Sequence, residues 1–487
     1  MQLRTVWAVV VATIGAYLLL LWPSLTGQAV NWRESYVLMV GRDLCRGEGT
    51  LWLPRVDTVA EGPGTTGMEF PLLNRAAASL ACGGPGQVIA ARALTLLLAV
   101  LGIAAVAWLA FREFPPEAAS VAVVAFAFSP LVLFYGRTIQ PDVPALSLAL
   151  VALALMDVSM SKDRPTRWGF YFLSAATLAL GALVKLPVLA YGLPLLALVW
   201  SRRGREAIAD WRYWLYLPIS LAPPAVWYWH ARGLQRQYGL YDFALGASFP
   251  ELLRTWASAD FYRSIFVQQL FDSYAFPVVS ALAVGSLIAC WRGTALWIRA
   301  LALGAVAFFF VAGDTAAWHF SYGLLAVPAL ALAAPVGVQR LLSRIPGERI
   351  PAAILGAARV AAAAYGPWRA RKWLAAAAVV PPTDAMKTAV DVRLAAGERV
   401  LVLSGGDPKL LRYLDRKGPV VGGNLGPWLN RAGPLPAAVV IDTGAARDWA
   451  SVARVALTSA DYPPIFQHSA MEVWLHASDG SPGERPH

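Results

Sequence analysis

Long apolar segments follow one another along most of this chain, and they constrain its fold more than any other feature. A helix needs about 20 apolar residues to cross the hydrocarbon core of a bilayer. Only 15% of the 487 residues are charged, whereas a soluble domain carries roughly 25%. We therefore predict an all-α polytopic membrane bundle of about eleven transmembrane helices, and we exclude soluble enzymes, coiled coils, collagens and disordered proteins. The predicted spans lie near residues 3–22, 88–111, 117–136, 141–158, 168–184, 186–200, 212–229, 275–291, 296–312, 319–338 and 350–366.

Basic residues gather in the short connections between these runs and indicate the orientation of the bundle. Cytoplasmic loops carry an excess of Lys and Arg, and with eleven spans the basic loops all fall on one side. We therefore predict a multi-pass protein of the bacterial inner (plasma) membrane, with its N-terminus in the cytoplasm and its C-terminal region outside. The net charge of +11 then reflects loop asymmetry, and we expect membrane lipids, not nucleic acid, as partners. The residues concerned are Lys162, Arg164, Arg167, Arg202, Arg203, Arg205, Arg212, Arg292, Arg299, Arg340, Arg344 and Arg349.

Three predicted outer segments are long enough to carry a function: residues 23–87, residues 230–274 and the region from 381 onward. The last contains short β-like runs at 400–404, 438–442 and 471–475, each rich in aliphatic residues. We therefore expect a transmembrane domain over 1–380, with juxtamembrane helices in its first outer loop, and a small extracytoplasmic α/β domain over 381–487.

Two of the three cysteines, Cys45 and Cys82, fall in the first outer segment. In an oxidising compartment they would form a disulfide, and two unpaired thiols are the alternative. Cys290 lies in an apolar run and is most simply a core residue.

The first outer segment also carries acids close to the membrane face, where an unpaired charge is costly. Arg33, Glu34 and Tyr36 follow the first span directly, and Glu69 precedes Phe and Pro near the end of the segment. These residues can be ordinary interfacial or solvated side chains. The alternative is that one of the carboxylates acts as a general base.

Further polar residues lie at the outer ends of later spans. Asp142 opens an apolar helix, either as an acid favoured by the helix dipole or as a carboxylate beside a cavity that Arg137 balances. Lys185 lies between two apolar runs, where it either extends to the interface or binds an anion such as a lipid phosphate. His319 and Tyr322 precede the tenth span, and a lone His is more often structural than catalytic.

The chain lacks HExxH, a Cys–His cluster, a phosphate-binding glycine loop and GxSxG. We therefore expect no metal site built from His and Cys and no certain cofactor, although a divalent cation held by carboxylates stays open. Acids and bases on one side of the bundle suit transfer of a group from a lipid phosphate to an acceptor outside the membrane. These residues are Glu34, Glu69, Asp142, Arg33, Arg137 and Lys185.

The order of these elements resembles the GT-C class of integral-membrane glycosyltransferases over about residues 1–340. It is closest to the bacterial branch related to protein O-mannosyltransferases and to the lipid A aminoarabinose transferase. The matching pieces are 32–36, 69–71, Arg137 with 141–142, 184–187, 227–230, and His319 with Tyr322 and Pro328.

The resemblance implies a GT-C-like fold, a polyprenyl-phosphate-linked sugar as donor and a lipid, glycan or protein hydroxyl as acceptor. An acid of the first outer loop activates the acceptor in that family. Here it is Glu69 or Glu34, because the usual Asp–Glu pair is replaced by Arg33-Glu34. The remaining implied roles are support by Asp142, donor-phosphate binding by Lys185, Arg137 and Arg33, and substrate binding by Tyr36, His319 and Tyr322.

We predict an inverting glycosyltransferase that uses a single displacement at the anomeric carbon. A polytopic transporter or lipid flippase is the main alternative, but transporters usually place charges near the membrane midplane and show repeats. A non-catalytic scaffold whose tail binds a partner is a third hypothesis.

Overall fold

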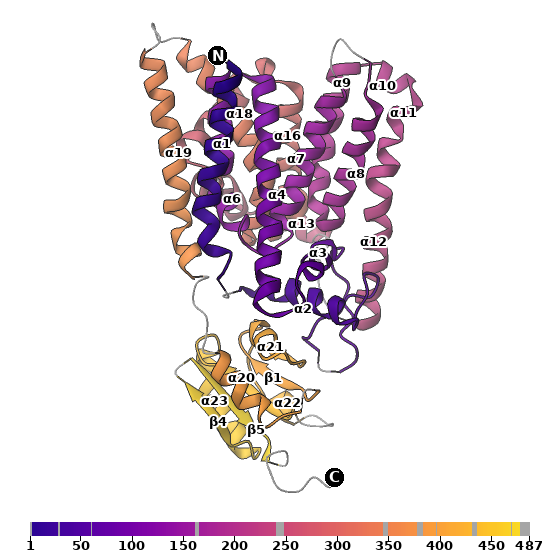
Figure 1. The fold of residues 1–487 in the computed structure, drawn as a ribbon, viewed down its shortest axis with the longest axis vertical. Helices are drawn as coiled ribbons and strands as arrows, with labels where there is room; N and C mark the ends of the chain where they lie inside the picture. Colours follow the sequence, from indigo (N-terminus) through magenta and orange to yellow (C-terminus); the bar gives the residue numbers. More distant parts are fainter. Residues whose placement is uncertain are drawn as a thin grey trace.

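The computed structural model describes the chain except for residues 1, 28–29, 60, 161–164, 240–247, 344–348, 377–382, 396, 431–435, 469 and 478–487. The predicted domain boundary at 380/381 and three predicted loop cations (Lys162, Arg164 and Arg344) lie outside the described residues. Figure 1 shows a helical bundle with a smaller domain below one end of it, and the N-terminal end of α1 lies at the opposite end of the bundle.

The bundle confirms the predicted all-α membrane fold, since every predicted apolar run coincides with one or two helices. Among the described residues, three helices are individually long and apolar enough to cross a membrane, and five apolar helices of 10–17 residues are shorter. The main helices are α1 (Gln2–Leu21), α4 (Gly84–Glu113), α5 (Pro116–Ala127), α6 (Pro130–Tyr135), α7 (Asp142–Ser159), α8 (Trp168–Val184), α9 (Gly192–Arg203), α12 (Tyr216–Tyr238), α15 (Pro277–Ala289), α16 (Leu296–Ala312), α18 (Val327–Leu342) and α19 (Arg349–Ala376).

The predicted span 117–136 is not a single helix, because it is broken between α5 and α6. Pro130 has no N–H to donate and disfavours a helical conformation at the residue before it, so the chain restarts with proline at the first position of α6. Ser129, at the break, donates its hydroxyl to the carbonyl of Tyr274 at 2.5 Å, which satisfies that buried group.

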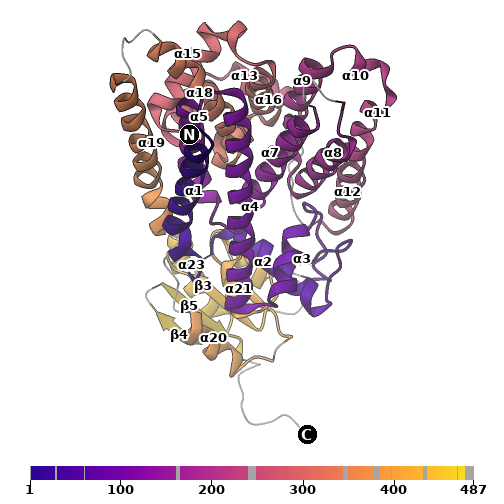
Figure 2. The same ribbon diagram turned by 45° about the horizontal axis from the view of Figure 1, so that its top comes forward.

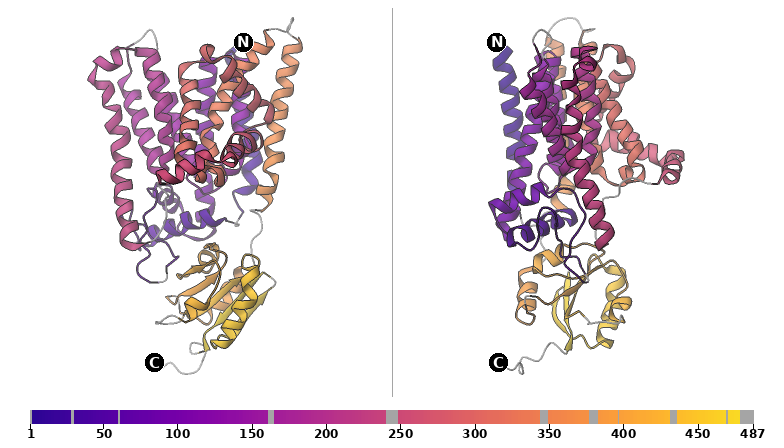
Figure 3. Two further views of the ribbon diagram at one scale, coloured as in Figure 1. Left: turned by 180° about the vertical axis from the view of Figure 1, so that it is seen from behind. Right: turned by 90° about the vertical axis from the view of Figure 1, so that its right-hand side faces the viewer.

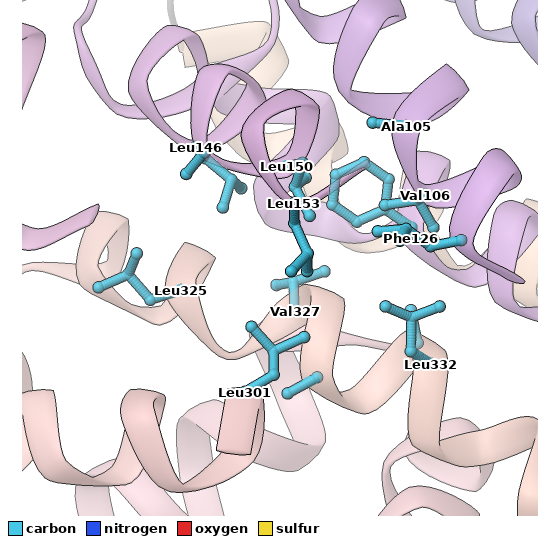
Figure 4. Packing of buried hydrophobic residues seen from close by; sticks show 14 of the residues in the cluster. Ala105, Val106, Phe126, Leu146, Leu150, Leu153, Leu301, Leu325, Val327 and Leu332 are labelled. Atoms are coloured by element: carbon cyan, nitrogen blue, oxygen red, sulfur yellow. The ribbon is translucent and has the colours of Figure 1, made fainter. Parts of the chain in front are cut away.

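The centre of the bundle is packed by helix faces of period 3.6. Leu150 and Leu153 of α7 lie beside Phe126 of α5 and Val327 of α18, and Leu146 of α7 belongs to the same apolar cluster (Figure 4). Spacings of four and three place the three leucines on one face of α7, which fixes α7 at the centre of the bundle. Asp142, the first residue of α7, is thereby held at the end that faces the smaller domain.

The smaller domain is a five-stranded sheet flanked by helices, as predicted for the C-terminal region. Its strands lie in the order β2-β1-β3-β5-β4, with β1 parallel to β2 and β3, and β5 antiparallel to β3 and β4. Its elements are α20 (Thr383–Asp391), β1 (Val400–Leu403), α21 (Lys409–Leu414), β2 (Val420–Val421), α22 (Gly426–Leu429), β3 (Ala438–Asp442), α23 (Arg447–Ser459), β4 (Pro464–His468) and β5 (Met471–Leu475).

The first outer segment joins the bundle to this domain. Its helices α2 (Trp32–Arg46) and α3 (Leu72–Leu80) lie between the two, with α2 beside α21 (Figures 1 and 2). Met39 of α2 belongs to the same apolar cluster as Leu411 and Leu414 of α21. The N–H of Gly418 donates to the carbonyl of Asp57 at 2.9 Å, so main-chain bonding also crosses the interface.

Candidate active site

The start of α2 is fixed by a reciprocal capping box. The side chain of Asn31 accepts the N–H of Glu34 at 2.9 Å, and a Glu34 oxygen accepts the N–H of Asn31 at 2.8 Å. The other Glu34 oxygen accepts the N–H of Ile139 at 3.0 Å and lies 3.8 Å from the guanidinium of Arg92. Glu34 is buried, with 2% of its surface exposed, so both of its oxygens are engaged within the protein.

Glu69 lies in a segment that is tied to two helices of the bundle. The N–H of Phe70 donates to the carbonyl of Leu183 at 3.0 Å, and the indole of Trp227 donates to the carbonyl of Met68 at 3.0 Å. A Cβ at position 67 would lie 2.0 Å from the carbonyl of Ala231, so only glycine permits this close approach to α12. These contacts fix the backbone on both sides of Glu69.

The Glu69 side chain pairs with Arg33 of α2 through one oxygen. Its other oxygen, Oε2, is buried and accepts no hydrogen bond from the residues that the structure describes. A buried carboxylate oxygen that receives no hydrogen bond is costly. The free lone pair of Oε2 can accept a proton from a bound hydroxyl.

Asp142 and Lys185 form a second, partly buried ion pair at the adjoining helix ends. Asp142 is at the first turn of α7, where the helix dipole favours a carboxylate. Lys185 is the extended residue at which α8 ends, two positions before Pro187. Its ammonium lies 5.2 Å from the centre of the Tyr322 ring, within range of a cation–π contact.

A small cavity lies against the Glu69–Arg33 pair. Arg33 and Glu69 line this space of about 20 Å³ together with Pro141 and Val184, the residues that precede Asp142 and Lys185 in sequence. The volume suffices for about one water molecule.

Tyr322 and His319 border the same group. All four charged side chains of the two pairs act electrostatically on Tyr322. The ring of His319 lies 6.1 Å from that of Tyr322 in an edge-on arrangement. Six of the nine predicted site residues are therefore assembled here: Arg33, Glu69, Asp142, Lys185, His319 and Tyr322.

Arg137 does not belong to this group. Its guanidinium donates to the carbonyl of Trp373 at 3.3 Å and stacks on Phe134 at 5.5 Å. The charged groups that act on it are Glu34 and Arg92. Arg137 therefore lies with Glu34 in a second, separate cluster of charges.

Tyr36 lies one turn after Arg33 on α2 and faces a larger cavity. That cavity, of about 210 Å³, is lined by Arg33, Tyr36 and Thr58 of the first outer segment and by Gly406 and Val420 of the C-terminal domain. Burial raises the pKa of the Tyr36 phenol, while a hydrogen bond with Thr58 and the charge of Arg33 oppose this change. Tyr36 is therefore a neutral hydrogen-bonding group at neutral pH.

Sequence reasoning missed two groups that hold the site together. Arg92 supports Glu34, and its only signal is a charge near one end of an apolar run. Trp52 stacks on Trp227 with ring centres 5.6 Å apart, and its carbonyl lies 2.8 Å from Nε2 of His230. These contacts connect the first outer segment to α12, and spacing along the chain gives no signal for them.

The part of the chain that the structure describes contains no group of three or more His, Cys, Asp or Glu side chains placed to hold a metal ion.

Comparison with known proteins identifies the fold. Residues 74–229 match the family model described as dolichyl-phosphate-mannose-protein mannosyltransferase. A search of curated proteins finds no match. The structure is similar to ArnT from Cupriavidus metallidurans in the apo state, with a TM-score of 0.67, 15% identity, and 97% of this chain and 99% of that chain covered.

Two further solved structures share the architecture. The same ArnT bound to undecaprenyl phosphate gives a TM-score of 0.61 at 15% identity, again over 97% of this chain and 99% of that one. The apo oligosaccharyltransferase of Archaeoglobus fulgidus gives 0.57 at 12% identity, over 87% of this chain and 65% of that one. The chain therefore has the GT-C fold, and the predicted resemblance to GT-C glycosyltransferases is confirmed.

Proposed function

We propose that this chain is an inverting glycosyltransferase that moves a sugar from a polyprenyl phosphate to a hydroxyl acceptor. The observation that carries the proposal is that two carboxylate–cation pairs, Glu69–Arg33 and Asp142–Lys185, lie close enough together to act on the same residue, Tyr322. A carboxylate can take the proton of the acceptor, and a cation can stabilise a phosphate leaving group. The pairs supply both functions within one site.

Glu69 is the proposed base because one of its oxygens is uncommitted. Oε2 of Glu69 receives no hydrogen bond from any described residue, whereas both oxygens of Glu34 accept main-chain N–H groups. Removal of the Glu34 carboxylate would leave the main-chain N–H groups of Asn31 and Ile139 without this acceptor. We therefore assign Glu34 a structural role and Glu69 the chemical one.

In the proposed step, the acceptor oxygen attacks the anomeric carbon as its proton moves to Glu69. The new carbon–oxygen bond forms while the bond from that carbon to the phosphate oxygen breaks. The lipid phosphate leaves with the electron pair, and Lys185 stabilises its charge. A single displacement inverts the anomeric configuration. Asp142 holds Lys185 in place before the phosphate arrives.

The nature of the donor is supported by the fold comparison, since one similar structure is of ArnT bound to undecaprenyl phosphate. The comparisons give no support to a transporter.

The proposed location is the bacterial inner membrane, with the site at its outer face. Helices α10 (Glu206–Ala209) and α11 (Trp211–Trp214), which follow Arg202 and Arg203, lie at the same end of the bundle as the N-terminus (Figure 3 and Figure 1). The C-terminal domain lies at the other end (Figure 3). The positive-inside rule then favours a cytoplasmic N-terminus and an outer C-terminal domain.

A transfer assay on the purified protein in nanodiscs tests the proposal. Radiolabelled polyprenyl-phosphate sugars serve as donors and a crude envelope extract as acceptor. We expect Glu69→Gln to lower kcat roughly 100- to 10,000-fold with little change in melting temperature. Lys185→Met should lower kcat and also weaken binding of undecaprenyl phosphate.

Glu61→Gln is the matched control, because Glu61 is an exposed acid of the same segment, and it should retain activity. Full activity of Glu69→Gln would overturn the choice of base. Absence of transfer from every donor by the folded wild type would overturn the transferase and favour transport or scaffolding.

A further inference from the structure

The larger cavity lies where the first outer segment meets the C-terminal domain, and the reaction described above leaves it unused. It shares Arg33 and Met68 with the small cavity beside Glu69. Arg33 therefore lines both cavities. It pairs with Glu69, the proposed base, and it also borders the cavity of about 210 Å³. A molecule in this cavity would contact Arg33, the residue that pairs with Glu69.

We propose that this cavity binds the acceptor and that the acceptor is a carbohydrate, one sugar ring of which presents its hydroxyl past Arg33 to Glu69. This inference rests on the proposed transferase activity and names its acceptor class. It also gives the C-terminal domain a role, since Gly406 and Val420 complete the cavity.

Size favours a single ring. An engineered cavity of about 150 Å³ holds one benzene molecule, and sites for drug-sized ligands span about 300–1,000 Å³. A volume of about 210 Å³ lies between these limits and suits one six-membered ring with its hydroxyls.

The chemistry of the walls also favours a sugar. Tyr36, Thr58 and Thr66 carry hydroxyls, and the hydrogen bond between Tyr36 and Thr58 leaves both of these oxygens with a lone pair that can accept another donor. Val56 and Met68 supply apolar surface for the C–H face of a ring. The mixture of hydroxyls and apolar surface matches a pyranose better than a lipid tail, which has no polar groups to bond.

Gly406, which lines the cavity, belongs to a turn at Gly405–Gly406. Both glycines have positive φ angles, 64° and 89°, which other residues rarely adopt. A Cβ on Gly406 would meet no atom within 4 Å, so the space beside it is open. The turn contributes backbone to the wall without filling the space.

Substitution of Val420 tests the proposal from the side of the cavity away from the base. Val420→Trp should fill the space, and Thr58→Val should remove one hydroxyl with little change of shape. The matched control is Val452→Trp, because Val452 is 52% exposed on α23 of the same domain. Melting temperatures confirm that each variant is folded.

The first readout is binding of methyl hexopyranosides and methyl pentopyranosides, measured by saturation-transfer NMR on the full-length protein in nanodiscs. We expect at least one pyranoside to bind the wild type and Val452→Trp, and to bind Val420→Trp at least about tenfold more weakly. This readout needs no turnover, so it separates failure of the acceptor site from failure of the transferase. Absence of pyranoside binding to the wild type, or equal binding to Val420→Trp, overturns the proposal.

The second readout is the fate of label in the transfer assay. We expect label in the glycan fraction, with the acceptor KM of Val420→Trp raised about tenfold and the affinity for undecaprenyl phosphate unchanged. Thr58→Val should raise the acceptor KM by a smaller factor. Label in lipid or protein alone, or an unchanged acceptor KM in Val420→Trp, would also overturn it.

Discussion

At the residue scale, one arginine of the first outer segment, Arg42, forms ion pairs with three carboxylates. Arg42 lies 2.8 Å from Asp43, 2.5 Å from Asp57 and 2.6 Å from Asp415. Asp43 and Asp57 are fully buried, and Oδ2 of each receives no hydrogen bond from the described residues. One cation cannot compensate two buried carboxylates, so protonation of one of them is favoured.

This arrangement predicts a pH-dependent stability. Burial raises the pKa of Asp57 to about 6, against the opposing charge of Arg42. The folded-state pKa exceeds the unfolded value of about 3.9, so the stabilising effect is complete below about pH 4 and is lost as the pH rises through about 6. Asp57→Asn, which mimics the protonated form, should raise stability at pH 7.5 by at most about 3 kcal/mol.

Melting temperatures in detergent at pH 5 and pH 7.5 measure the effect. The gain of Asp57→Asn over wild type should be larger at pH 7.5 than at pH 5. Asp448→Asn is the control, because Asp448 is exposed on α23. A gain that is equal at both pH values, or a loss at pH 7.5, would show that Asp57 stays ionised in the folded protein.

The sequence predicts which residues can do chemistry better than it predicts their contacts. Charges at the ends of apolar runs identify Asp142 and Lys185, because such residues are rare in membrane helices, and Glu69 is identified as an acid of the first outer segment. Asn31 and Glu34 have the spacing of a capping box, so the hydrogen bond of Glu34 to the start of the helix could be predicted from the sequence. The separation of Arg137 from Lys185 could not be predicted from the sequence, because it depends on how α6 packs against α19.

At the element scale, the first outer segment is closed by a disulfide between the ends of its two helices. Cys45, in the last turn of α2, bonds to Cys82, just after α3, with Cα atoms 5.7 Å apart. This confirms the pairing and rejects two free thiols. The bond closes the part of the chain that carries Glu69 and some of the residues that line each cavity, so it constrains the site.

Removing this bond should loosen the site. A Cys45→Ala/Cys82→Ala variant should lose about 2–4 kcal/mol of stability, since the closed loop spans 37 residues. A reducing agent should lower the melting temperature of the wild type but not that of the variant. Cys290→Ser is the control, because Cys290 is free and buried elsewhere, and it should keep the sensitivity to reduction. Equal melting temperatures for wild type and double variant would contradict the prediction.

Elements are predictable where they are long and periodic. The apolar runs identify the helices, and β1, β3 and β5 follow from aliphatic runs of four or five residues. The strands β2 and β4 are missed because β2 has two residues and β4 begins with proline and is largely exposed. Their existence depends on pairing with β1 and β5, which is a tertiary effect.

At the scale of the whole molecule, the position of the C-terminal domain could not be predicted. Its contacts with the first outer segment join residues about 370 positions apart, such as Lys417 and Glu48 at 2.6 Å. Local patterns carry no information on such pairs. The larger cavity, and the function proposed for it, nevertheless depend on these contacts, because Gly406 and Val420 of that domain line it.

The docking of the domain should therefore weaken when its charges are removed. Asp415 forms ion pairs with both Arg42 and Arg46, the latter at 2.7 Å. Its backbone φ is 56°, a conformation that asparagine also tolerates. We expect Asp415→Asn with Lys417→Gln to cost about 1 kcal/mol, because these pairs are partly exposed. Opening of the interface would then be roughly fivefold more frequent.

Hydrogen exchange at Gly418 reports this opening, because its N–H donates across the interface to Asp57. Exchange there should accelerate in the double variant, while exchange within β3, at the centre of the sheet, should not change. Asp461→Asn is the matched control, since Asp461 also has a positive φ, of 60°, and is exposed. Faster exchange in β3 as well would mean that the domain itself unfolds, and unchanged exchange at Gly418 would mean that apolar contacts such as that of Met39 hold the interface without these charges.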